Sequence, residues 1–237
     1  MPTKNDLFIL HDSVLFKLIN LIREAHKIVI CAHRSPDGDA LGASLGLAGY
    51  LRRLGKSTAI IMPNPFPDFL KWLPGSNNVS FFDDNIHLAN SKIKQADLIF
   101  MLDFSSLDRI KEMGNAVCES KATKIIIDHH LDPDMTAADL VFSYPSACST
   151  CELIFKIIYQ MGGYEDMSSK DAVCLYTGMM TDTGGFTYNS TSPVIYSIIS
   201  LLLNKSIDKD RIYRNVFNNY SENRLRFLGY ILYEKLR

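Results

Sequence analysis

The sequence lacks a long apolar run, and it carries almost no net charge. The run around Leu201–Leu203 ends at Asn204 and Lys205, too early to cross a bilayer. Lys and Arg total 25 against 26 for Asp and Glu, so we expect no broad basic face that grips a long nucleic acid through many phosphates. Small anionic substrates stay compatible with this balance, because a local cluster of cations is enough to bind them. Residues 1–6 lack the basic-then-apolar layout of a signal peptide.

Cysteine is scarce and irregularly spaced. The five cysteines are an odd number without a disulfide framework, which is typical of a reducing compartment. Cys148 and Cys151 form a Cys-x-x-Cys pair at a predicted helix start, a setting that can serve redox chemistry. Since no other feature supports that role, we expect both as small buried residues. The chain is predicted to be cytoplasmic, without membrane contact.

Short apolar runs alternate with helical periodicity along the chain. The runs that predict strands cover residues 27–32, 57–62, 98–102 and 124–127. Continuous apolar runs of this kind are typical of a parallel sheet buried on both faces. The predicted helices cover residues 12–26, 40–54, 150–161, 168–180, 193–203, 208–218 and 221–236. We therefore predict an α/β domain with a parallel sheet and flanking helices, followed by a helical segment.

The helical part carries two local expectations. Ser149 and Glu152 match a capping box at the start of the 150–161 helix. Four aromatic residues recur at helical spacing near the end of the sequence, and they are Phe217, Tyr220, Phe227 and Tyr230. We expect these four in the core rather than as platforms on which bases stack.

Carboxylates and imidazoles follow the ends of four apolar segments. One motif, His-Arg-Ser-Pro-Asp-Gly-Asp, follows the run 27–32, and Asp-His-His follows Ile127. In a parallel sheet, the strand ends that carry such side chains meet at one edge, where ligands bind. The candidate metal ligands at these ends are His33, Asp37, Asp39, Asp103, His129 and Asp182.

Oxygen ligands mixed with imidazole nitrogen suit Mn²⁺, with Mg²⁺ as the alternative ion. Six ligands are too many for one catalytic ion that keeps open positions, so two ions are expected. The four aspartates would also repel one another without metal, whereas two divalent ions balance their charge. Two such ions about 3.5–4 Å apart can activate water and support in-line displacement at phosphorus. The predicted reaction is metal-dependent hydrolysis of a phosphoester or phosphoanhydride.

Three further residues are candidates for substrate binding. Arg109 follows Asp103 closely and could place its guanidinium fork on a phosphate, or it could form a surface ion pair with Asp108; both stay open. Gly184 and Gly185 follow Asp182. We expect them to let the backbone approach the metals or the substrate, since glycine tolerates unusual torsions.

In order and type, these motifs resemble those of the DHH phosphoesterase family over about residues 10–230. They are most similar to the branch of oligoribonucleases (nanoRNases) and 3′-phosphoadenosine 5′-phosphate phosphatases. The resemblance implies two Mn²⁺ sites that share Asp103 as a bridging ligand. The implied ligands are His33, Asp37 and Asp103 for one ion, and Asp39, Asp103, His129 and Asp182 for the other.

The same resemblance implies roles for the remaining motif residues. His130 would face the phosphate as a hydrogen-bond donor or proton source. Asp128 would orient a ligand, with direct contact as the alternative. Asp103, Asp128 and His130 are therefore the expected catalytic residues, and the resemblance also allows a homodimer.

That branch continues into a smaller C-terminal domain, whose glycine- and histidine-bearing motif grips the far phosphate and base. We expect residues 1–220 to form the DHH catalytic domain and residues 221–237 to begin an interdomain linker helix. The substrate domain would then be missing from this sequence, or another subunit would supply its surface.

The predicted activity is manganese-dependent phosphodiesterase or phosphatase action on short oligoribonucleotides, linear dinucleotides or 3′,5′-bisphosphate nucleosides. An inorganic pyrophosphatase of the same superfamily is one alternative. A metal- and nucleotide-binding sensor without turnover is another. A processive single-strand exonuclease is disfavoured, because the near-neutral charge and short length leave little groove along which to track a strand.

Overall fold

The computed structural model describes residues 4–219 and 222–236. Six parallel strands form one sheet in the order β3-β2-β1-β4-β5-β6. The strands are β1 (Lys27–Ala32), β2 (Ser57–Met62), β3 (Val79–Phe81), β4 (Leu98–Leu102), β5 (Thr123–Asp128) and β6 (Leu140–Ser143). The chain leaves β1 toward one edge of the sheet and continues from β4 toward the other, so the strand order reverses between β1 and β4. Ligand sites in such sheets lie at this reversal.

Side-chain alternation along the strands builds a core on each face of the sheet. In β4 all five residues are buried; Phe100 faces one core, and Ile99 and Met101 face the other. This two-sided burial explains why the strands read as continuous apolar runs. The predicted strands β1, β2, β4 and β5 are confirmed, whereas the short edge strands β3 and β6 were missed.

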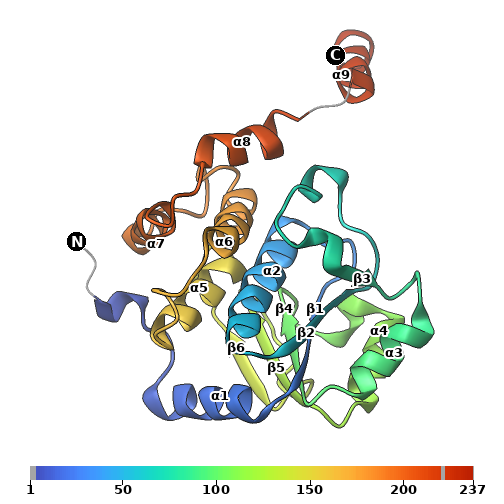
Figure 1. Ribbon diagram of the computed structural model, residues 1–237. Coiled ribbons are helices and arrows are strands. Elements are labelled where there is room, and N and C mark those ends of the chain that lie inside the picture. Colours follow the sequence, from blue (N-terminus) through green and yellow to red (C-terminus); the bar gives the residue numbers. More distant parts are fainter. Residues whose placement is uncertain (1–3, 220–221, 237) are drawn as a thin grey trace.

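Helices cover both faces of the sheet (Figure 1). The larger core packs against α1 (Asp12–Glu24), α2 (Gly38–Arg53), α5 (Thr150–Gln160), α6 (Ser169–Asp182) and α7 (Pro193–Leu203). The smaller core packs against α3 (Ile86–Lys94) and α4 (Glu112–Glu119), neither of which was predicted. The chain continues through α8 (Lys209–Phe217) and α9 (Glu222–Tyr230) into a π-helical turn, Ile231–Lys235. The predicted α/β class with a following helical segment is confirmed.

The described aromatic residues near the end of the sequence differ in burial, and only Phe217 packs against the larger core. Phe217 is half-buried at the end of α8, but Phe227 and Tyr230 on α9 are 64% and 52% exposed. The core prediction is wrong for both, because helical spacing defines a face of α9 that no described element covers (Figure 1). Tyr220 lies outside the described residues.

The predicted capping box at α5 is only half formed. Ser149 is the N-cap, and its hydroxyl accepts a hydrogen bond from the Glu152 amide at 3.1 Å. The Glu152 carboxylate does not return to Ser149; it accepts from the Cys148 amide at 2.8 Å and pairs with Lys156 at 2.5 Å. A buried lysine one turn away therefore competes for the carboxylate that the box requires.

Candidate metal centre

The loop after β1 begins the candidate metal centre. Asp37 caps α2: its Oδ1 accepts hydrogen bonds from the amides of Asp39 and Ala40, each at 3.0 Å. Gly38 follows because α6 packs closely here, and a Cβ at this position would lie 2.3 Å from the hydroxyl oxygen of Thr181. The Asp-Gly-Asp order thus combines a helix cap with close packing of α2 on α6.

One group of ligand-type side chains consists of His33, Asp37 and Asp103. The His33 Nε2 atom lies 3.5 Å from Asp103 Oδ2 and 3.9 Å from Asp37 Oδ1. His33 Nδ1 donates to the carbonyl of Arg34 at 2.8 Å, which leaves Nε2 to face the carboxylates. Burial lowers the pKa of His33, but the hydrogen bond with Asp103 and the nearby negative charges outweigh burial, so the pKa is raised.

A second group consists of Asp39, His129 and Asp182. The His129 Nε2 atom lies 3.5 Å from Asp182 Oδ2 and 3.9 Å from Asp39 Oδ2. It also lies 3.6 Å from Asp103 Oδ1. Asp103 therefore presents Oδ2 to the first group and Oδ1 to the second, and all six predicted ligands meet around it.

Asp103 itself has an unusual backbone. It follows β4 with φ = 64°, in the left-handed region, while its amide donates to the carbonyl of Ile127 at 3.1 Å. Such torsions carry a strain of about 1–3 kcal/mol at functional sites, and the surrounding structure must hold them in place. Asp103 is 1% exposed, and its carboxylate lies between His33 and His129.

The start of α5 supports the carboxylates from behind. Asp39 accepts a hydrogen bond from the Thr150 amide at 2.6 Å and another from the Cys151 amide at 2.9 Å. The Thr150 hydroxyl donates to Asp103 Oδ1 at 2.9 Å. Thr150 was not identified as a site residue from the sequence, which predicts it only as the first residue of a capped helix.

The electrostatics of the cluster fit divalent cations. Burial, followed by the charges of neighbouring aspartates, raises the pKa of Asp39 well above its usual range. Burial likewise raises the pKa of Asp182 to about 6. Within residues 4–219 and 222–236, the ion-pair partners of these carboxylates are histidines rather than lysine or arginine. The chain thus gathers oxygen and nitrogen donors, several of them buried, that positive metal charge would stabilise.

His130 and Asp128 form a pair beside this cluster. Asp128 is fully buried, and its Oδ1 accepts from His130 Nδ1 at 2.7 Å. That hydrogen bond is the largest cause of the raised pKa of His130, whose side chain is 46% exposed. Asp128 therefore lies behind His130, in a position to orient it, while His130 faces the open side.

Arg109 shares a pocket with the two histidines. This pocket, of about 580 Å³, includes Arg109, His129, His130 and Asn189 in its lining. The Arg109 carbonyl also accepts from the Arg34 amide at 2.8 Å, which links the loops after β1 and β4. The structure places no ion pair between Asp108 and Arg109 within the described residues.

Gly184 and Gly185 form a turn after α6 with φ values of 55° and 74°. A Cβ at Gly184 would lie 2.2 Å from the ring of Tyr188. The positive φ values favour glycine at both positions, and the close approach leaves no room for a side chain at Gly184. The crowding here comes from an aromatic ring of the same turn.

The cysteine pair is inert in this fold. Cys148 and Cys151 are unbonded and buried, and burial raises the pKa of both thiols. A raised pKa removes the reactive thiolate, so the packing prediction is confirmed.

The described segments include no helix with both the length and the apolar character that a bilayer crossing requires.

Comparisons with known proteins identify the family of this chain. Residues 27–179 match the model of the DHH family, N-terminal domain, which is more than half of the chain. The bifunctional oligoribonuclease and PAP phosphatase NrnA of Thermus thermophilus is 32% identical over 177 residues, which are 74% of this chain and 49% of that protein. A probable NrnA of Streptococcus mutans is 29% identical, over 79% of this chain and 55% of that protein.

A solved structure is similar over almost the whole chain. The exopolyphosphatase-related protein from Bacteroides fragilis superposes with a TM-score of 0.94 at 49% identity, covering 97% of this chain and 67% of that chain. The chain spans about half the length of the curated relatives it matches. With the motif order, the family match and the six side chains gathered around Asp103, the chain belongs to the DHH family.

Proposed function

We propose that this chain is a divalent-cation-dependent phosphohydrolase that acts on short oligoribonucleotides, or on 3′,5′-bisphosphate nucleosides, with Mn²⁺ as its preferred ion. One observation carries the proposal: two groups of histidine and aspartate side chains meet at the buried carboxylate of Asp103. The NrnA relatives, which are named as oligoribonucleases and PAP phosphatases, support the choice of substrate. The ligand set suits two ions, and two ions can hold both the attacking and the leaving oxygen when a group is displaced at phosphorus.

The proposed ligands follow from the two groups. His33, Asp37 and Asp103 would hold one ion, and Asp39, His129 and Asp182 would hold the other together with Asp103. When bound, such ions supply Lewis acidity and a more acidic water. The α5 amides keep Asp39 oriented for this task through their two hydrogen bonds.

The other residues would act on the substrate. His130 holds a proton more tightly than a free histidine because Asp128 accepts from it, so it can donate to a phosphate oxygen or leaving group. Arg109 lines the same pocket and carries the fork that matches phosphate. Together these two side chains would stabilise the charge that develops at phosphorus.

The proposal extends to domain organisation. Residues 1–220 would form the catalytic domain, and residues 221–237 would begin a linker helix to a smaller substrate domain. The exposed apolar face of α9 and the greater length of the NrnA relatives support this division. We also propose that the chain forms a homodimer and works in the cytoplasm. The five cysteines form no disulfide, which is compatible with that compartment.

A substrate panel tests the activity. The chain is incubated with Mn²⁺ and 5′-phosphorylated diadenylate, a pentaribonucleotide, 3′-phosphoadenosine 5′-phosphate or pyrophosphate. We expect cleavage of a nucleotide substrate, and loss of about 100-fold or more in Asp103→Asn, because even outer partners of metal ligands are worth 10–100-fold. The control is Asp84→Asn, at an exposed aspartate that belongs to neither ligand group.

The alternatives give different results. Turnover of pyrophosphate alone would indicate an inorganic pyrophosphatase. Metal and nucleotide binding without any turnover would indicate a sensor. Full activity of Asp103→Asn would refute the two-group mechanism.

A further inference from the structure

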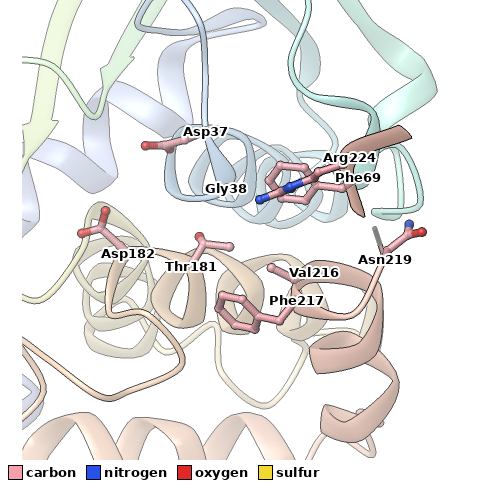
Figure 2. A pocket seen from close by; sticks show the side chains of 9 residues that line it. All are labelled: Asp37, Gly38, Phe69, Thr181, Asp182, Val216, Phe217, Asn219 and Arg224. Atoms are coloured by element: carbon pink, nitrogen blue, oxygen red, sulfur yellow. The ribbon is translucent and has the colours of Figure 1, made fainter. Parts of the chain in front are cut away.

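A second pocket opens from the metal centre, and it shares no lining residue with the pocket that contains Arg109 and His130. It has a volume of about 320 Å³. Asp37 and Asp182 lie at one end of it and Asn219 at the other (Figure 2). A molecule bound here would therefore extend directly from the metal centre.

The walls of this pocket are apolar and aromatic. Phe69 comes from the short helical turn Asp68–Leu70, and Phe217 ends α8; the two side chains lie on different sides of the pocket (Figure 2). Both are half-buried. The Phe217 ring is supported by Tyr213, with ring centroids 5.0 Å apart. The pocket thus has aromatic faces whose positions are set by packing.

The pocket lining also includes polar side chains. Asn219 and Arg224 contribute an amide and a guanidinium to the lining (Figure 2). From the carboxylates, the lining continues past the aromatic rings to the Asn219 amide, and the Arg224 guanidinium overlaps the Phe69 ring in this view (Figure 2). A nucleoside presents a matching series: a phosphate ester, a planar base with apolar faces, and polar base edges.

We propose that this pocket binds the base and sugar of one nucleotide, while the phosphate of that nucleotide lies at the metal centre. The proposal rests on the phosphohydrolase function above and adds the subsite that selects its substrate. With a nucleoside here and the Arg109 pocket beside the same centre, both groups esterified to a phosphodiester have a place. Inorganic pyrophosphate would leave the aromatic pocket empty.

Two substitutions test the aromatic contribution. Phe69→Leu and Phe217→Leu keep apolar volume but remove the flat face. Stacking on an aromatic side chain is worth about 1–3 kcal/mol per base, so we expect kcat/KM for 5′-phosphorylated diadenylate to fall about tenfold in each variant. Phe227→Leu, at a phenylalanine outside the pocket, is the matched control.

Abasic substrates separate stacking from general damage. Two analogues of the dinucleotide each lack one of its two bases. If Phe217 contacts a base, the loss from Phe217→Leu and the loss from removing that base are not additive, because both delete the same contact. Additive losses with both analogues, or unchanged kcat/KM for the dinucleotide in both leucine variants, would overturn the subsite.

A binding measurement keeps the subsite distinct from the activity. Saturation-transfer NMR with adenosine 5′-monophosphate and Mg²⁺ needs no turnover. We expect transfer to the base protons in the unmodified chain, with a clear decrease in Phe217→Leu. Such transfer without hydrolysis of any substrate would uphold the subsite and refute the proposed activity. Hydrolysis without transfer to the base, or with transfer that Phe217→Leu does not reduce, would uphold the proposed activity and refute the subsite.

Discussion

Replacing Thr150 by valine should weaken metal binding without changing the shape of the site. The valine side chain keeps the branched volume of threonine in a fully buried position. It removes the hydroxyl that donates to Asp103 Oδ1 at 2.9 Å, while the amide at position 150 can still donate to Asp39. The substitution therefore tests one hydrogen bond to the shared carboxylate.

The expected size of the effect follows from that bond. A hydrogen bond to a charged group contributes about 1.5–3 kcal/mol, which corresponds to roughly 10- to 100-fold in an equilibrium constant. Outer partners of metal ligands fall in the same range when they are removed. We therefore expect the Kd for Mn²⁺ to rise about 10- to 100-fold in Thr150→Val.

Isothermal titration calorimetry with Mn²⁺ measures this change directly. Thr150→Ser keeps the hydroxyl and loses only a methyl group, so its Kd should stay close to that of the unmodified chain. Equal affinity of Thr150→Val and the unmodified chain would refute the role of the hydroxyl. Equal weakening in the serine and valine variants would show that packing, not hydrogen bonding, matters at this position.

Three further predictions concern pH, histidine orientation and packing. With the pKa of Asp182 raised to about 6 by burial, protons compete with metal, so the rise in Tm caused by Mn²⁺ should shrink below pH 6; an equal rise at pH 5 and 7.5 would contradict this. In the metal-free chain, the same shift stabilises the fold below about pH 4, and that contribution is lost as the pH rises through about 6. Asp128→Asn should lower the pKa of His130 in an NMR titration, because it removes the carboxylate that raises it; an unchanged pKa would rule out this pairing. Gly178→Ala would place a Cβ 2.2 Å from the Cys151 sulfur and should reduce the free energy of unfolding by about 1–3 kcal/mol in urea, whereas unchanged stability would mean that α5 and α6 can separate freely.

The strands that the sequence predicts are those buried on both faces. β1 and β4 are runs of five or six residues that are almost entirely buried, so apolar composition alone marks them. β3 and β6 have three and four residues and are mostly half-buried at the sheet edges. Their pairing depends on neighbouring strands, which no local pattern records.

Some residues of the candidate site could be predicted from the sequence, and others could not. The residues that follow β1, β4 and β5 could be grouped from the sequence because parallel strands deliver their ends to one edge. Asp182 instead ends α6, so its place beside His129 depends on how that helix packs. Thr150 could not be predicted, because its hydrogen bonds depend on how α5 docks against the loops after β1 and β4. Phe217 packs against the larger core, as predicted, but helical spacing does not reveal the pocket that this residue also lines.

Anomalous diffraction at the manganese absorption edge, from crystals of this chain soaked in Mn²⁺, tests the central claim most directly. We predict two peaks about 3.5–4 Å apart, one beside His33 and one beside His129, with Asp103 in contact with both. A single peak, or two peaks that Asp103 does not join, would contradict the proposed two-metal centre.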